Sequence, residues 1–168
     1  MMALVDVLDA MPGNANGRDT LIDMLGDLSR ALLLSRDART MLWYQVPDQP
    51  ALAGNYIESS ASAMFAYAFA RGANRGYIGS AYRTAAQETF GALVRDMVTI
   101  DAGGDVDLHG IAAGAGLGGT PYRDGSAAYY AGVPRGTNDM KGYAPLLLAA
   151  IELERTARRE PHPGDNGK

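Results

Sequence analysis

The sequence contains no cysteine, one tryptophan, three phenylalanines and two histidines among its 168 residues. The absence of cysteine excludes disulfides, thiolate metal sites and cysteine nucleophiles. The two histidines, His109 and His162, lie far apart in the chain. A metal site built on histidines is therefore not expected.

The sequence also lacks an excess of basic residues and long apolar runs. The net charge is −4 and the isoelectric point is near 5.1, with the arginines scattered along the chain. This composition argues against nucleic acid or an anionic membrane surface as the main partner. No apolar run approaches the roughly 20 residues that a membrane span needs. No signal peptide is present, which favours a cytoplasmic location.

The composition that remains is that of a globular domain, with 47% hydrophobic and 20% charged residues. Apolar residues recur at helical spacing in several segments, and they predict helices over residues 21–32, 57–72, 80–99 and from Pro145 onward. No βαβ repeat and no run of strands is present. The sequence therefore predicts an all-α fold built from helical hairpins.

The first eleven residues begin in the middle of a helical pattern. Apolar residues stand at positions 1, 4, 5, 8 and 11, and no Ser, Thr, Asp or Asn precedes them as a cap. We expect this segment to be the end of a helix that begins earlier in a longer protein. The missing signal peptide is therefore weak evidence about location.

A short strand is expected at residues 106–108, pairing near Ile111. A long segment follows it and runs to Tyr143, and residues 117–126 of this segment form a glycine-rich loop. The segment has three tyrosines in nine residues, unlike disordered loops, so we interpret it as an ordered loop that shapes a site. Arg123 and Asp124 within it could pin the loop by bonding backbone groups or could face a ligand carboxylate. The sequence leaves both alternatives open.

Trp43 and Gln45 are two residues apart in a segment expected to be extended, so their side chains point to the same side. An indole beside an amide suits a sugar, because the ring stacks on an apolar sugar face and the amide bonds a hydroxyl. The alternative is a tryptophan that anchors its loop on the core. Asn55 and Glu58 precede a predicted helix and are expected to cap it.

No carboxylate pair with an acid–base pattern stands out, and the glycine run lacks the Lys-Ser/Thr ending of a phosphate loop. These residues therefore indicate part of a carbohydrate or polar-ligand site without its main catalyst.

Several separated motifs occur in an order that resembles one enzyme family. They are LWYQV at 42–46, NYIESSASAMF at 55–65, GLGG at 116–119, YRDGS at 122–126, and Asn-Asp with Lys-Gly at 138–142. The chain resembles the unsaturated glycosyl hydrolases of glycoside hydrolase family 105 and 88 type, such as unsaturated rhamnogalacturonyl hydrolase.

The resemblance implies the C-terminal half of an (α/α)6 barrel over residues 1–158, followed by a disordered polar tail at 159–168. It implies hydrolysis at the non-reducing-end Δ4,5-unsaturated uronic acid of pectin-derived oligosaccharides, with no metal or organic cofactor. An aspartate upstream of the matched region would be the catalyst, so no catalytic residue is expected in this chain. By position, Trp43, Gln45, Arg123 and Asp124 would bind substrate.

Other interpretations remain open at this point. The substrate could instead carry an unsaturated glucuronyl unit, or the chain could be a non-catalytic helical module for carbohydrate binding or assembly. A half barrel exposes core-facing apolar helix sides. We therefore expect the N-terminal half of the barrel, or a second copy of the chain, as partner.

Overall fold

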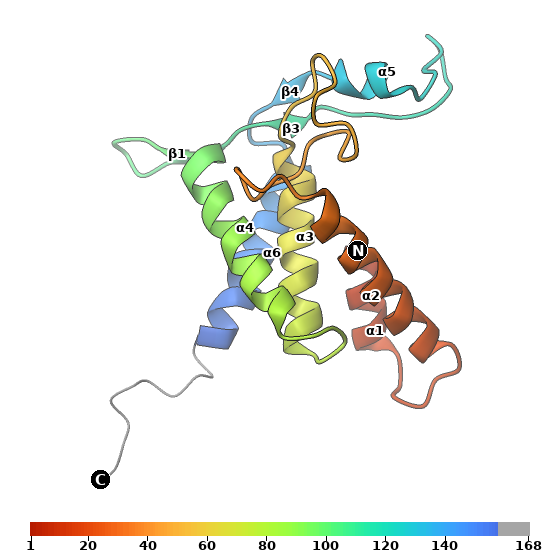
Figure 1. Cartoon of the computed structure of the whole chain (residues 1–168). Helices are drawn as coiled ribbons and strands as arrows, with labels where there is room; N and C mark the ends of the chain where they lie inside the picture. The colour runs from red at the N-terminus through yellow and green to blue at the C-terminus, as the bar shows by residue number, and fades with distance from the viewer. Residues whose placement is uncertain (158–168) are drawn as a thin grey trace.

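The computed structural model describes residues 1–157, and the predicted tail at 159–168 lies outside the described residues (Figure 1). The helices are α1 (Met2–Ala10), α2 (Arg18–Ser35), α3 (Ser59–Asn74), α4 (Ala81–Met97), α5 (Ala127–Ala131) and α6 (Met140–Ala157). The strands are β1 (Val98–Ile100), β2 (Val106–Leu108), β3 (Ile111–Ala112) and β4 (Arg135–Gly136). The predicted all-α class is confirmed, because the strands within residues 1–157 form only two small antiparallel pairs.

The long helices run alternately up and down (Figure 1). α3 packs against α1, α4 and α6, so it is the central helix of the described chain. The connections at one end are short, at residues 11–17 and 75–80. At the other end they are long, at residues 36–58 and 98–139, and they carry all the strands and α5 (Figure 1). The helices thus form a support, and both long connections lie at one end of it, which we call the loop end.

Small residues allow α3 to occupy this central position. Ala63, Ala66 and Ala70 are fully buried and recur at three- and four-residue spacing, so they lie along one side of the helix. Their size lets the neighbouring helices approach closely at native packing density. Trp43 and Phe69, the largest fully buried side chains, belong to the same core cluster as Ala66 and Ala70.

Strand pairing differs from the sequence expectation. β2 pairs antiparallel with β1, with Val98 opposite Leu108, whereas β3 at Ile111 pairs antiparallel with β4. The predicted pairing of residues 106–108 near Ile111 is therefore wrong. The β1–β2 hairpin extends α4 directly, and this is why the helix ends at Met97.

The last helix also begins earlier than predicted. Asp139 caps it: its Oδ1 accepts a hydrogen bond from the Lys141 N–H at 2.9 Å. Pro145 consequently lies inside α6, where it has no N–H to donate to the Lys141 carbonyl. α5 was not expected at all; its first turn is capped by Ser126 Oγ, which accepts from the Tyr129 N–H at 3.1 Å.

Candidate functional site

The long connections at one end of the helices form the candidate site. They contain every residue that the sequence predicts to bind substrate, namely Trp43, Gln45, Arg123 and Asp124. The structure separates these residues into two groups, because residues 36–58 lie against the tops of α2 and α3, whereas residues 113–126 extend outward beside α5 (Figure 1).

A buried carboxylate joins the two connections. Glu58, the N-cap of α3, is 2% exposed. Its Oε1 accepts hydrogen bonds from the Ser60 N–H at 3.2 Å and the Ser60 hydroxyl at 2.7 Å, and its Oε2 accepts from the Ala61 N–H at 2.5 Å. Oε1 also accepts from the Ala112 N–H of β3 at 2.9 Å. The predicted capping function of Glu58 is confirmed, and the carboxylate in addition fixes β3 above the helix.

Asn55 does not cap the helix. Its side-chain amide donates to the carbonyls of Val46 and Gln49 at 3.0 and 2.8 Å, and its oxygen accepts from the Val46 N–H at 3.1 Å. Asn55 therefore closes the loop of residues 46–55, and its expected place at the cap is taken by Glu58.

Trp43 anchors its loop on the core. The side chain is fully buried, its Nε1–H donates to the Leu32 carbonyl at 2.8 Å, and its ring contacts Phe65 edge-on at a centroid distance of 5.0 Å. No face of the indole is free to stack on a sugar. The prediction that Trp43 binds substrate is wrong, because the apolar ring gains more from burial beside Phe65 and Phe69 than from exposure at the loop surface.

Gln45, by contrast, is only partly buried, and its N–H donates to the Tyr56 carbonyl at 2.9 Å. The same short ladder pairs Tyr44 with Ile57. This pairing fixes the backbone of Gln45, and the Gln45 side chain shares no exposed surface with the Trp43 indole, because the indole is fully buried. Substrate binding by Gln45 stays a prediction.

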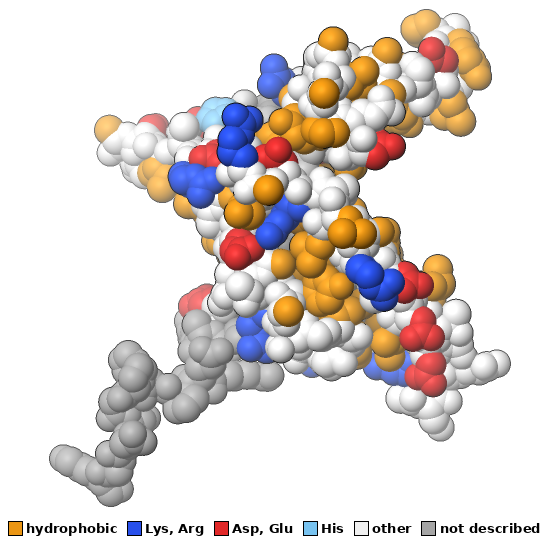
Figure 2. All heavy atoms as spheres, viewed as in Figure 1, with side chains coloured by type: hydrophobic (Ala, Val, Ile, Leu, Met, Phe, Trp, Pro, Cys, Tyr) orange, Lys and Arg blue, Asp and Glu red, His pale blue; other side chains and the backbone are white. Residues whose placement is uncertain are grey.

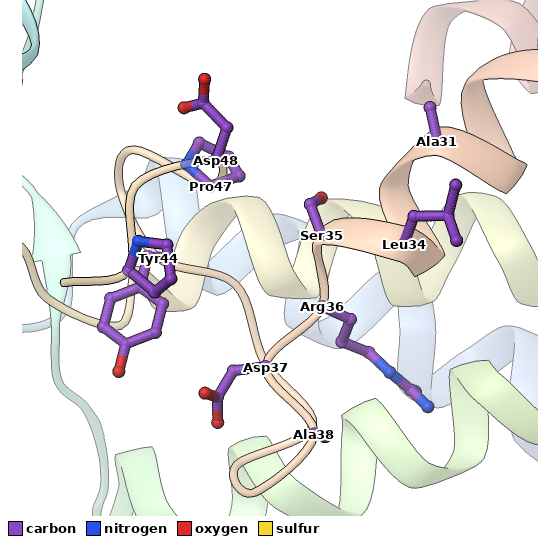
Figure 3. Close-up of a pocket in the computed structure, with 10 residues that line it drawn as sticks. Ala31, Leu34, Ser35, Arg36, Asp37, Ala38, Tyr44, Pro47 and Asp48 are labelled. Atoms are coloured by element: carbon purple, nitrogen blue, oxygen red, sulfur yellow. The ribbon is translucent and has the colours of Figure 1, made fainter.

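Tyr44 lines a cavity of about 470 Å³ between the end of α2 and residues 44–50 (Figure 3). Figure 3 shows Tyr44 and Asp48 on one side and Ser35 and Leu34 of α2 on the other. Arg36 points away from the cavity and pairs with a carboxylate oxygen of Glu88 on α4 at 2.8 Å. Its charge is thereby neutralised within the protein.

The Asp37 carboxylate is also hydrogen-bonded within the protein. Its Oδ1 accepts hydrogen bonds from the Thr40 N–H at 2.7 Å and from the Thr40 hydroxyl at 2.9 Å. The backbone hydrogen bond from Thr40 holds the pKa of Asp37 below its usual value, and burial only partly opposes it. The Asp37 carboxylate thus stabilises its own turn.

Arg123 and Asp124 pin their own loop. Arg123 Nε donates to the Gly118 carbonyl at 2.8 Å, and the two residues also pair through their backbones. Asp124 Oδ1 accepts from the Ser126 N–H at 2.9 Å, which lowers the pKa of the Asp124 carboxyl. Of the two alternatives open from the sequence, the structure shows the pinning of the loop. Contact of either side chain with substrate stays a prediction.

A second cavity, of about 570 Å³, lies beside the β3–β4 pair, and we call it the β3–β4 cavity. It is lined by residues from four separate segments: Asn55, Tyr56, Ile57, Met97, His109, Gly110, Arg135, Gly136 and Thr137.

The polar side chains of the β3–β4 cavity are held in place by their neighbours. The Arg135 guanidinium carbon lies 5.0 Å from the centroid of the Tyr56 ring, in a cation–π arrangement. His109 Nε2 is 2.9 Å from the Thr99 hydroxyl, and its Nδ1 is 3.1 Å from the Thr137 hydroxyl. Burial and the nearby Glu58 charge raise the pKa of Tyr56, although Arg135 opposes this shift.

Sequence reasoning missed Tyr56 and Arg135 as site residues. They stand far apart in the chain and meet only because β4 pairs with β3, opposite Ala112. His109 enters the sequence prediction only as one of two histidines that lie too far apart for a metal site. No local pattern in the sequence signals the Tyr56–Arg135 contact, because it depends on the pairing of β3 with β4.

Within residues 1–157, no group of three or more His, Asp or Glu side chains is arranged to hold a metal ion. No helix in this part of the chain is both long and apolar enough to cross a membrane.

The chain is similar to a known protein family and to two known proteins. The profile of Glycosyl Hydrolase Family 88 matches residues 1–157. Protein Atu3128 of Agrobacterium fabrum and the 24.9 kDa protein in the picA locus of Rhizobium radiobacter are each 40% identical over 166 residues. The match covers 94% of this chain and 69% of each relative.

Solved structures share the fold. A family 105 glycoside hydrolase of C. acetobutylicum superposes with a TM-score of 0.89 at 38% identity, over 92% of this chain and 43% of its own. A possible family 105 member of Klebsiella pneumoniae gives 0.76 at 26% identity, over 93% and 37%. A family 88 hydrolase of Bacteroides vulgatus gives 0.70 at 21% identity, over 92% and 40%, and shows the fold alone.

This chain thus spans less than half the length of these solved structures. The prediction of a partial helical barrel is confirmed, as is the resemblance on which it rests. Because the family profile extends over the whole described chain, the protein belongs to Glycosyl Hydrolase Family 88.

Proposed function

We propose that this chain forms part of a glycoside hydrolase that acts on the non-reducing-end Δ4,5-unsaturated uronic acid of pectin-derived oligosaccharides of the rhamnogalacturonan type. The observation that carries the proposal is the family match along residues 1–157. The elaborated loop end supports it, because it offers cavities lined by polar and aromatic side chains at the end of a rigid helical support.

The proposed reaction is hydration of the vinyl ether. A carboxylic acid donates its proton to C4 of the unsaturated ring, and water adds to C5 with loss of a proton to the resulting carboxylate. The hemiketal that forms at C5 then opens, and the glycosidic bond breaks to release the neighbouring sugar. No electrons are exchanged with a cofactor, and the acid is regenerated in the cycle.

In the proposed enzyme this chain supplies walls of the pocket. Gln45 would bond a sugar hydroxyl, and the loop that Arg123 and Asp124 hold together would close one side. The carboxylates described above at Glu58 and Asp37 are occupied by hydrogen bonds within the protein, so neither is a free proton donor. The catalytic aspartate is proposed to belong to another part of the enzyme.

We therefore expect the isolated chain to be inactive, because a positioned acid–base group typically contributes 10²–10⁴-fold to the rate. Purified chain would be incubated with an unsaturated galacturonyl disaccharide, and the ultraviolet absorbance of the conjugated double bond followed. A matched sample would contain a complete family 88 hydrolase as positive control. Loss of absorbance with the chain alone would contradict the proposal that the catalytic aspartate belongs to another part of the enzyme.

Exposed apolar helix faces support a partner that completes the barrel, and Figure 2 shows hydrophobic side chains gathered over the helices on the face toward the viewer. Met24 and Leu28 are four residues apart on one face of α2, and Leu147 and Ile151 are four apart on one face of α6; all four are exposed. Such faces cover each other in a closed helical barrel. We propose the N-terminal half of the barrel as partner, or a second copy of the chain when that half is absent.

Sedimentation velocity separates these states. A chain that self-associates sediments faster as its concentration rises, whereas a sharp monomer peak at all concentrations would argue against an uncovered half barrel. Substitution of Leu147 and Ile151 by Ser should weaken the association, and the same substitution at Leu117, on the loop before α5, serves as control.

One alternative substrate and one alternative function can each be tested. An unsaturated glucuronyl unit is the alternative substrate, and hydrolysis of the two disaccharides by the completed barrel, compared side by side, decides between the two substrates. The cavities at the loop end would also suit a non-catalytic carbohydrate-binding or assembly module. Such a module would bind saturated and unsaturated oligosaccharides equally well and would gain no activity when combined with the other half of a barrel.

A further inference from the structure

The β3–β4 cavity differs in charge from the rest of the molecule. The chain carries a net charge of −4, yet no Asp or Glu lines this cavity, while Arg135 does. The buried Glu58 carboxylate, whose charge acts on Tyr56, is already bonded by the N–H groups of Ser60, Ala61 and Ala112. The cavity therefore offers the positive charge of Arg135 to an incoming group.

Arg135 has no carboxylate partner within salt-bridge distance among the described residues. Its guanidinium instead stacks on the face of Tyr56. Stacking fixes the plane of the guanidinium and leaves its N–H edge open, the geometry in which arginine binds a carboxylate through two parallel hydrogen bonds.

The surroundings of Arg135 are preorganised. β4 is paired to β3, and the Glu58 carboxylate holds β3 through the Ala112 N–H. On the other side, the Thr99 and Thr137 hydroxyls fix both ring nitrogens of His109. A ligand thus has few side chains to order when it binds, which favours affinity.

The size and the apolar part of the lining suit a monosaccharide unit. About 570 Å³ lies within the range of small-ligand pockets. Ile57 and Met97 offer an apolar side for the C–H face of a sugar ring, and the Thr137 hydroxyl can bond a sugar hydroxyl.

We infer that the β3–β4 cavity is a subsite for a uronic acid residue, whose carboxylate binds Arg135 while its ring lies between Met97 and Thr137. The inference rests on the proposed function for the kind of oligosaccharide, but the geometry requires only a sugar with a carboxylate. In a longer substrate this subsite would hold a uronate unit other than the one that is hydrolysed.

The test uses the full 168-residue chain and saturated ligands, so it needs no hydrolysis. D-Galacturonate, D-galactose and acetate are titrated into labelled protein, and amide shifts are followed by nuclear magnetic resonance. Galacturonate should shift the signals of residues 55–57, 109–110 and 135–137. Galactose lacks the carboxylate and acetate lacks the ring, so both should bind much more weakly.

Matched variants localise the binding. Arg135→Ala should weaken galacturonate binding at least about tenfold, the effect of losing one charge-assisted interaction. Arg135→Lys should give an intermediate loss, because it keeps the charge without the planar fork. Arg39→Ala removes an exposed arginine elsewhere on the loop end and should leave binding unchanged.

The inference is overturned if galacturonate does not bind, if galactose or acetate binds as tightly, or if Arg135→Ala binds like the parent chain. Hydrolysis of the unsaturated disaccharide by the completed barrel is read separately. Binding that depends on Arg135 without hydrolysis would refute the proposed function alone, and hydrolysis without such binding would refute the subsite alone.

Discussion

Arg71 of α3 and Glu152 of α6 form an ion pair in the interior, with 2.5 Å between Nη1 and Oε1. The same guanidinium contacts Asp9 of α1, so one side chain joins the three helices that start at the loop end. The Asn74 amide donates to the Glu152 carbonyl at 3.0 Å and strengthens the α3–α6 contact. The support beneath the candidate site is therefore held by charge as well as by apolar packing.

Arg71→Met should lower the free energy of unfolding by about 3 kcal/mol. Removal of one member of a buried cluster leaves its carboxylates uncompensated, and the value lies at the low end for such pairs because Arg71 is 18% exposed. Denaturant titration followed by circular dichroism measures the loss. Arg30→Met, which breaks the exposed pair with Asp27, should cost less than about 1 kcal/mol; equal losses in both variants would contradict the prediction.

Asp9 should make stability depend on acid pH. Burial opposes ionisation, but the hydrogen bond from Tyr77 and the charges of Arg71 and Arg75 outweigh it and hold the pKa of Asp9 below the usual 3.8. Because the folded state then binds fewer protons than the unfolded state, this stabilisation is fully present above pH 3.8. It is lost as the pH falls through the lower folded value.

Asp9→Asn should therefore flatten the acid side of the stability profile. Unfolding free energies measured between neutral pH and the acid transition would fall less steeply in the variant than in the parent. Asp23→Asn, on α2 and outside the cluster, is the control. A profile that stays unchanged in Asp9→Asn would show that other carboxylates dominate the acid transition.

Glu58→Gln should destabilise the chain by about 2 kcal/mol. Both carboxylate oxygens accept from N–H or O–H groups, and an amide must place its NH₂ against one of these donors. The change also releases β3, so amide exchange at Ala112 should quicken. Glu88→Gln, on the exposed side of α4, should change neither quantity by a comparable amount. Unaltered amide exchange at Ala112 would show that the Glu58 carboxylate is not what holds β3 in place.

Local patterns in the sequence predicted the helices well, because apolar periodicity is a property of each segment. The predicted helix at 57–72 corresponds to α3, and that at 80–99 to α4, within a few residues. Pro145 misled the prediction of α6, since a cap at Asp139 outweighs one lost hydrogen bond. The capping of α3 by Glu58 was also predictable from the residue type.

The site was less predictable, because its residues meet only through tertiary contacts. Arg135 reaches Tyr56 through a strand pairing that residues 106–108 were expected to make elsewhere. The burial of Trp43 depends on Phe65 and Phe69, and the extended spacing of Trp43 and Gln45 contains no information about those rings.

Trp43→Phe should lower the free energy of unfolding by about 1–3 kcal/mol, since the Leu32 carbonyl loses the hydrogen bond from Nε1–H and keeps only the one from the Ser35 hydroxyl, and the smaller ring fills less of the core. It should leave galacturonate binding unchanged, because the indole has no exposed face. Denaturant titration followed by circular dichroism gives the first quantity, and the nuclear magnetic resonance titration gives the second. A loss of sugar affinity without loss of stability would restore Trp43 as a binding residue.

Arg123→Ala should loosen the loop of residues 117–126 while leaving the global unfolding free energy within about 0.5 kcal/mol, as is usual for an exposed residue. The Nε–H of Arg123 bonds the Gly118 carbonyl, and the guanidinium also packs over Gly119, whose φ of +86° keeps the loop turned. Hydrogen exchange of the Gly118 and Arg123 amides, which bond each other's carbonyls, should quicken in the variant. Gly114→Ala has open space around the added methyl group and should leave these amides unchanged. If exchange is equally slow in Arg123→Ala, the backbone alone holds the loop, and the arginine is free to bind a ligand carboxylate.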